Sequence, residues 1–199
     1  DLMSSGAALR ETIFYGAESA YSFQYRDIAP EKYEADSSWM LQEKGFTIAT
    51  AKLVADFLGT LVSRKLTLLV QPRIGELMEP WRCLSGFTFR ISEIAESLSL
   101  DLIQVQKIID AFCLPSASKN ESFTSLNSFN ATNATPIIRM PDDTYILFQP
   151  YSLNEALYES PFYWMSADRR YRDTAMENRG LFTEGFSFRK LVEIFGARN

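Results

Sequence analysis

Apolar residues recur every three or four positions in several parts of the chain, which is the spacing of an amphipathic helix. The first such pattern covers residues 7–36, and Pro30 predicts a break there, with a second short helix starting near it. Another helix is predicted over residues 47–62. The apolar run 65–70 fits either a short strand or a continuation of that helix, because so short a run shows no decisive period.

Residues 89–112 carry the clearest local pattern, which predicts two short helices joined by a tight turn. Ser92 is positioned to cap the first helix and Asp101 the second. Ser99 stands in the turn, where glycine is most common. The spacing of small and apolar residues resembles that of the helix-turn-helix family: Ala95, Leu100, Val105 and Ile108.

A β-hairpin is predicted after a polar loop at residues 116–135. The apolar runs 136–140 and 144–148 flank the turn sequence Pro141-Asp142-Asp143. Two helices followed by a hairpin look like a winged helix, although the preceding loop is longer than such a unit usually has.

Two more helices are predicted near the end of the chain, a charged one over residues 168–178 and an amphipathic one over residues 182–195. Gly196 is a natural cap for the last helix. The predicted fold class is therefore mainly α (α+β). We divide the chain into a helical region (1–80), a winged-helix-like module with a long polar loop (81–150) and C-terminal helices leading into a further domain (151–199).

Composition narrows the classes of protein that fit. A hydrophobic content of 46% is typical of a folded domain, and a net charge of −5 argues against wrapping nucleic acid by bulk charge. The sequence shows neither an apolar run of about 18 residues nor a signal peptide, so we predict no membrane partner. Cys83 and Cys113 are expected to be free thiols in a reducing compartment, and the predicted location is the cytoplasm.

The chain contains no histidine, which excludes hydrolases that use imidazole as a base and zinc sites that need it as a ligand. No glycine-rich phosphate-binding loop is present either. We therefore predict no complete catalytic centre and no cofactor in this chain.

DNA contacts are conceivable at two places. The second helix of the helix-turn-helix would offer Gln104, Gln106 and Lys107 to bases and phosphates, although acidic residues surround it. The only basic cluster contains three further candidates for contacts with the phosphate backbone: Arg169, Arg170 and Arg172. The alternative for this cluster is a solvated helix with internal ion pairs.

Three segments, 147–164, 14–21 and 178–184, look like parts of large uncharacterised bacterial proteins in which an N-terminal helical region precedes a nuclease-related domain. The resemblance implies that the chain is the non-catalytic front part of such a protein. In nuclease domains of the PD-(D/E)xK type, a glutamate on the first helix precedes the metal-binding residues, and Glu184 matches that position. A divalent metal would then belong to the full-length protein, not to this chain.

Three hypotheses follow. In the first, the chain positions DNA or a partner protein for a nuclease-related domain. In the second, it is a protein-interaction or oligomerisation module without nucleic-acid contact. The third hypothesis is a winged-helix regulator that binds DNA by itself.

Overall fold

The computed structural model of the chain describes residues 21–70, 80–115, 123–125, 128 and 130–196. This part is mostly helical and has a small mixed sheet, so the predicted mainly α (α+β) class is confirmed. The helices are α2 (Ser22–Lys32), α3 (Ser37–Glu43), α4 (Ile48–Val70), α5 (Ile91–Leu98), α6 (Leu102–Ala111), α7 (Ala131–Ala134), α8 (Pro150–Ala167) and α9 (Arg172–Phe195). Two 3₁₀ segments, η1 (Glu34–Asp36) and η2 (Pro80–Phe87), complete the helical elements.

The break predicted at Pro30 lies three residues later, at Tyr33, and the predicted second short helix follows it as η1 and α3. Helix α2 continues through Pro30 to Lys32, where the backbone tightens into η1. Pro30 lies in the last turn of the helix, so its missing N–H removes only one hydrogen bond near an end that frays in any case. The part of the predicted pattern before residue 21 lies outside the described residues.

Residues 65–70 continue α4 and do not form a strand. Lys65 Nζ donates to the carbonyl of Thr88 at 3.0 Å and to Glu93 Oε2 at 3.2 Å, which ties this part of the helix to the next segment. Gly86 of η2 leaves room for Leu66, since a Cβ there would lie 2.7 Å from Leu66 Cδ2. The apolar run therefore packs as a helix against η2.

Helices α5 and α6 form the predicted pair. Asp101 caps α6 by accepting a hydrogen bond from the backbone N–H of Gln104 at 3.0 Å. Ser92 does not cap α5, because the helix starts at Ile91 with Arg90 in the capping position. Ser99 takes the left-handed conformation, with φ of 53°, that the turn requires.

The sheet has four short strands: β1 (Thr88–Phe89), β2 (Cys113–Leu114), β3 (Ile137–Arg139) and β4 (Tyr145–Ile146). Their order is β1-β4-β3-β2, with β4 antiparallel to both β1 and β3, and β2 parallel to β3. The predicted hairpin is confirmed as β3 and β4, and Asp143 in its turn has a positive φ of 58°.

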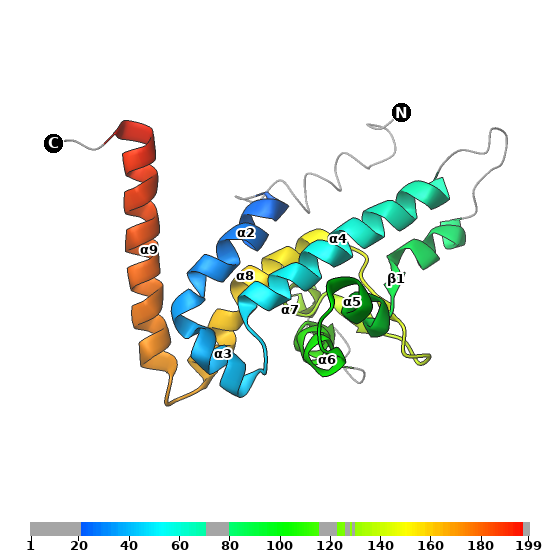
Figure 1. The fold of residues 1–199 in the computed structure, drawn as a ribbon, viewed down its shortest axis with the longest axis horizontal. Helices are drawn as coiled ribbons and strands as arrows, with labels where there is room; N and C mark the ends of the chain where they lie inside the picture. Colours follow the sequence, from blue (N-terminus) through cyan, green and yellow to red (C-terminus); the bar gives the residue numbers. More distant parts are fainter. Residues whose placement is uncertain (1–20, 71–79, 116–122, 126–127, 129, 197–199) are drawn as a thin grey trace.

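Helix α8 runs through the middle of the molecule and packs against α2, α4, α7 and α9 (Figure 1). Its Trp164 ring lies 5.4 Å from the ring of Phe112 at the end of α6 and 6.5 Å from that of Phe46 before α4. One buried apolar cluster therefore draws residues from the helices before the sheet, from the sheet region and from the last helices.

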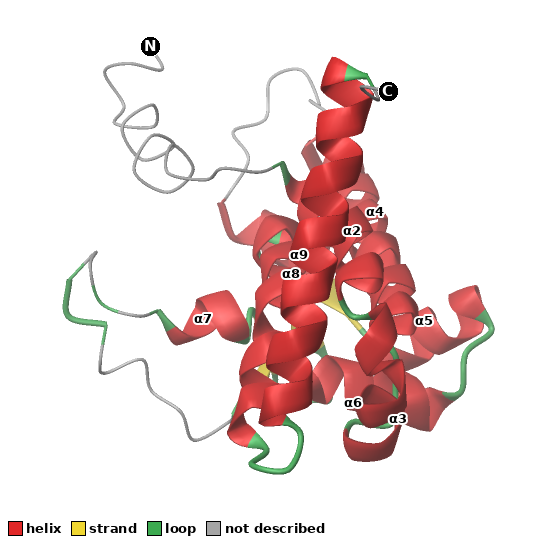
Figure 2. Ribbon diagram, turned by 90° about the vertical axis from the view of Figure 1, so that its left-hand side faces the viewer, coloured by secondary structure: helices red, strands yellow, loops and turns green. Residues whose placement is uncertain are grey.

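The last two predicted helices are a single one. Helix α9 runs unbroken from Arg172 to Phe195 and ends at Gly196 as predicted, with φ of 75° (Figure 2). Gly180 lies in its interior, where a glycine costs about 1 kcal/mol relative to alanine. Phe182 and Phe186 lie beyond Gly180 on the same side of α9 as the buried Ala175. Their stacked rings lie 5.6 Å apart.

Ser99→Gly should stabilise the protein by about 0.5–1 kcal/mol, because a residue with a Cβ pays about 1–2 kcal/mol in the left-handed region while glycine pays a smaller entropic cost. Ser97→Gly, two residues earlier inside α5, is the matched control and should destabilise by about 0.5 kcal/mol. Urea unfolding of the two variants measures both effects. Equal destabilisation by both would contradict the strain assigned to Ser99.

Candidate interaction surfaces

The exposed side of α6 is the first candidate site. Gln106, predicted to contact bases, is already engaged: its Nε2 donates to Asp110 Oδ1 at 2.7 Å and to the hydroxyl of Tyr145 on β4 at 3.1 Å. Gln104 is half-buried in the first turn. These contacts hold α6 on the sheet and leave Gln106 little freedom to read a base edge.

Lys107 is the only cation within α6. Its side chain lies over Gly45, since a Cβ at Gly45 would come within 2.7 Å of Lys107 Cδ and 2.6 Å of its Nζ. Asp101 and Asp110 are exposed at the two ends of the same helix. The charge on this surface is therefore not basic, and phosphate would meet two carboxylates and only one ammonium group.

Two apolar side chains dominate what α6 shows to solvent. Leu102 is 53% exposed and Ile103 is 67% exposed, side by side in the first turn. We name Leu102, Ile103 and Lys107 the α6 surface. The sequence pattern gave no sign of it, because apolar residues in an amphipathic helix are expected to face the core.

The predicted arginine cluster lies elsewhere. Arg169 and Arg170 are exposed in the turn between α8 and α9, and Arg172 forms an exposed ion pair with Asp173 at 3.6 Å. The turn is fixed by Asp168, which accepts a hydrogen bond from Trp39 Nε1 at 3.0 Å. Figure 1 shows α3 between this turn and α6, so the two predicted basic sets do not form one surface.

Glu184, the predicted nuclease-type glutamate, is exposed on α9. Its neighbours one turn away on the helix are Leu181 and Phe188, both exposed. Among the described residues, no three side chains of the metal-binding types come together as ligands.

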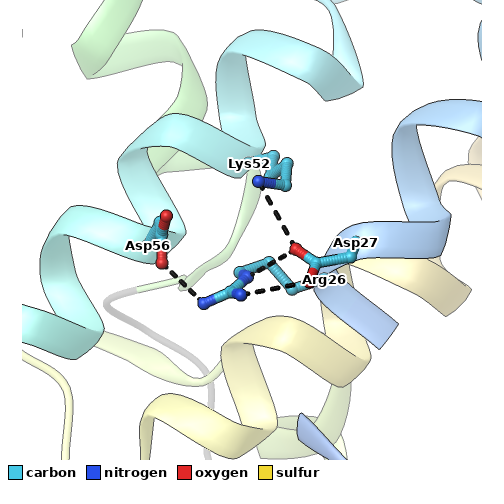
Figure 3. A network of polar contacts seen from close by, with 4 residues as sticks. All are labelled: Arg26, Asp27, Lys52 and Asp56. Atoms are coloured by element: carbon cyan, nitrogen blue, oxygen red, sulfur yellow. Dashed lines mark hydrogen bonds and ion pairs between the residues drawn. The ribbon is translucent and has the colours of Figure 1, made fainter. Parts of the chain in front are cut away.

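A groove of about 540 Å³ between α2, α4 and α8 was not foreseen from the sequence. Figure 3 shows the polar network at its edge, in which Arg26 of α2 reaches Asp56 of α4 at 2.5 Å and Asp27 at 2.9 Å. Lys52 lies 3.4 Å from Asp27. The hydrogen bond from Arg26 holds the pKa of Asp27 below its usual range. These opposite charges neutralise one another, and the network joins α2 to α4.

A second unforeseen feature is a set of buried and half-buried polar residues between α2, η1 and α9, which we name the charged junction: Lys32, Asp36, Tyr171, Asn178 and Arg179. Asp36 is fully buried, and its Oδ1 accepts hydrogen bonds from the Tyr171 hydroxyl at 2.9 Å and from Asn178 Nδ2 at 2.6 Å. These bonds fix the start of α9 on η1.

The guanidinium of Arg179 is buried against aromatic rings, 4.5 Å from the centre of Tyr33 and 5.4 Å from that of Phe162. None of its nitrogens has a hydrogen-bond partner among the described residues, and the same holds for Asp36 Oδ2. Contact with ring faces offsets part of the cost of burying this cation.

Lys32 is only 7% exposed. Its Nζ donates to the carbonyl of Tyr158 at 2.8 Å and lies 3.3 Å from the centre of the Tyr158 ring. Burial lowers the pKa of Lys32 to about 7, the nearby Glu159 carboxylate opposes this shift, and the charge of Arg179 adds to it. Lys32 is thus poised between its charged and neutral forms at neutral pH.

Comparison with known protein families, with curated proteins and with solved structures finds no significant match to this chain. Among the described helices, none is long and apolar enough to cross a membrane alone. One bent pair, Glu34–Glu43 with Ile48–Leu69 at 86°, has the required length and composition.

The free energy of unfolding should rise between pH 7 and pH 10 by up to about 4 kcal/mol because of Lys32. In this range the unfolded chain keeps its proton on Lys32 while the folded protein releases it, so raising the pH favours the folded state. Lys32→Met should remove this slope and raise stability at pH 6–7. Chemical unfolding across this pH range measures it.

The control is Lys190→Met, which removes the same charge from an exposed position on α9 and should keep the slope. A slope that persists in Lys32→Met and disappears in Lys190→Met would show that Lys32 does not titrate near neutral pH.

Proposed function

We propose that the chain is a protein-interaction module of the winged-helix type, in which the α6 surface contacts an apolar side chain of a partner protein. The order of elements supports the winged-helix assignment: α4 is followed by β1, the pair α5 and α6, and the hairpin β3–β4. Strands β1, β4 and β3 lie side by side and antiparallel, as a wing requires.

The observation that carries the proposal is the exposure of Leu102 and Ile103 where a DNA-reading helix would place polar or basic side chains. Exposed large apolar residues are enriched at contacts between proteins, and they gain free energy when a partner removes them from water. Contact with DNA would gain them little free energy, because the surface of DNA is dominated by phosphates.

A second candidate function is favoured by the exposed arginines at the α8–α9 turn. Arg169 and Arg170 would contact the phosphate backbone if the chain were the non-catalytic front part of a nuclease-related protein. In that case, DNA would run along the turn and not along α6.

Binding to labelled duplex and single-stranded DNA, titrated from 20 to about 200 mM salt, separates these functions. We expect no affinity for DNA that rises as the salt concentration falls. We also expect Lys107→Glu to leave the binding of DNA unchanged. Affinity that falls steeply with salt and is lost in the double variant Arg169→Glu/Arg170→Glu would favour the second candidate. Loss in Lys107→Glu would instead point to DNA reading by α6.

A photo-crosslinking residue in place of Gln104 tests the interaction directly in the cells that make the protein. We expect a protein adduct that resists nuclease treatment and disappears when Ile103→Asp is added. Because Ile103 is exposed, this change should alter the free energy of unfolding by less than about 0.5 kcal/mol, so loss of the adduct will not reflect misfolding. A nucleic-acid adduct at this position would contradict the proposal.

A further inference from the structure

The outward side of α9 carries six large apolar side chains, all more than half exposed. We name these residues the outer face of α9: Met176, Leu181, Phe188, Leu191, Ile194 and Phe195. The opposite side of the helix, with Ala175, Phe182 and Phe186, packs toward the body of the protein. Figure 1 shows α9 upright at the edge of the molecule, with its C-terminal end pointing away from α3.

The spacing on the outer face is that of a coiled coil. Leu181, Phe188 and Phe195 follow one another at seven residues, and Leu191 lies three residues after Phe188. These are the a and d positions of a heptad, the arrangement that a helix uses to pack against a second helix. The flanking positions Val192 and Ile194 are also apolar, which widens the contact surface.

We infer that α9 pairs with α9 of a second copy of this chain, which makes the protein a homodimer. The aromatic side chains Phe188 and Phe195 carry about 150–250 Å² each, and the five side chains from Leu181 to Phe195, all more than half exposed, offer on the order of 600 Å² of apolar surface. A stable interface buries about 800 Å² per partner, so these side chains supply most of the area that a dimer needs. In a dimer with two-fold symmetry, both copies contribute the same surface to the interface. Pairing of the outer face with itself meets this requirement.

The charges on α9 select an antiparallel pair. Glu184 occupies a d position of the heptad and is the one charged residue between Leu181 and Phe195 at an a or d position. A parallel pair in register would place the two Glu184 carboxylates opposite each other, which is unfavourable.

In an antiparallel pair centred on Phe188, residues whose numbers add up to 376 lie opposite each other, so Glu184 faces Val192 of the second copy. At about 1.5 Å of rise per residue, the two glutamates are then about 12 Å apart along the axis.

This inference does not depend on the α6 surface, which lies on another helix. The first test is the molar mass of the purified chain, measured by analytical ultracentrifugation from 1 to about 100 μM. A dimer is expected, and Phe188→Asp and Leu191→Asp should each raise its dissociation constant by at least about 30-fold. A monomer at every concentration would overturn the inference.

Leu41→Asp is the matched control, because Leu41 on α3 is 51% exposed and Leu191 on α9 is 55% exposed. The control should dimerise like the unaltered chain. Loss of the dimer in Leu41→Asp, or a dimer that survives both α9 substitutions, would place the interface elsewhere and overturn the inference. Circular dichroism of each variant verifies that the fold is retained.

A pair of cysteines tests the antiparallel arrangement. Glu184→Cys alone should give no disulfide between copies under mild oxidation, because the two cysteines are about 12 Å apart along the axis and a disulfide needs Cα atoms within about 7 Å of each other. Adding Val192→Cys should link the two copies, since residues 184 and 192 lie opposite each other in this arrangement. A disulfide-linked dimer in Glu184→Cys alone, or none in the double variant, would overturn the antiparallel arrangement.

Discussion

The packing of α8 against α2 and α4 is the interaction on which the rest of the structure depends. Leu153, Ala156 and Leu157 of α8 are buried, and they belong to one apolar cluster with the helices that precede the sheet. The same helix reaches the α5–α6 pair through Trp164 and the ring of Phe112. Segments that are far apart in the sequence therefore stabilise each other, and neither end of the described chain has a core of its own.

This shared core explains how the protein tolerates the charged junction. Burying a cation such as Lys32 or Arg179 costs several kcal/mol unless it finds compensating contacts. Those contacts come from α8 and its neighbours: the carbonyl of Tyr158 accepts from Lys32, and the rings of Tyr33 and Phe162 cover Arg179. At the charged junction, Asp36 and its two hydrogen-bond donors fix the position of α9. The buried Lys32 makes the stability of the same region depend on pH.

Local patterns in the sequence predicted local structure well, and tertiary effects set the limit. The turn at Ser99, the cap at Asp101 and the hairpin at residues 137–146 all depend on a few neighbouring residues, and all are confirmed. Pro30 was read as a break and residues 168–178 and 182–195 as two helices, but α2 passes through Pro30 and α9 is continuous through Gly180. The exposure of Leu102 and the burial of Arg179 had no sequence signal, because a periodic pattern does not reveal which apolar face lacks a partner.

The two exposed apolar surfaces have different physical characters, and this separates their proposed roles. The α6 surface is small, flanked by Asp101 and Asp110 and held rigid by the contacts of Gln106, which suits a specific and reversible contact with another protein. The outer face of α9 is long and carries large apolar side chains around Glu184, and leaving such a surface in water favours association. Since α6 and α9 lie apart in the fold (Figure 1), pairing of α9 would leave the α6 surface accessible on both copies. A dimer of this kind would present two identical contact surfaces to its partner, which raises the apparent affinity of a weak contact without any change in the contact itself.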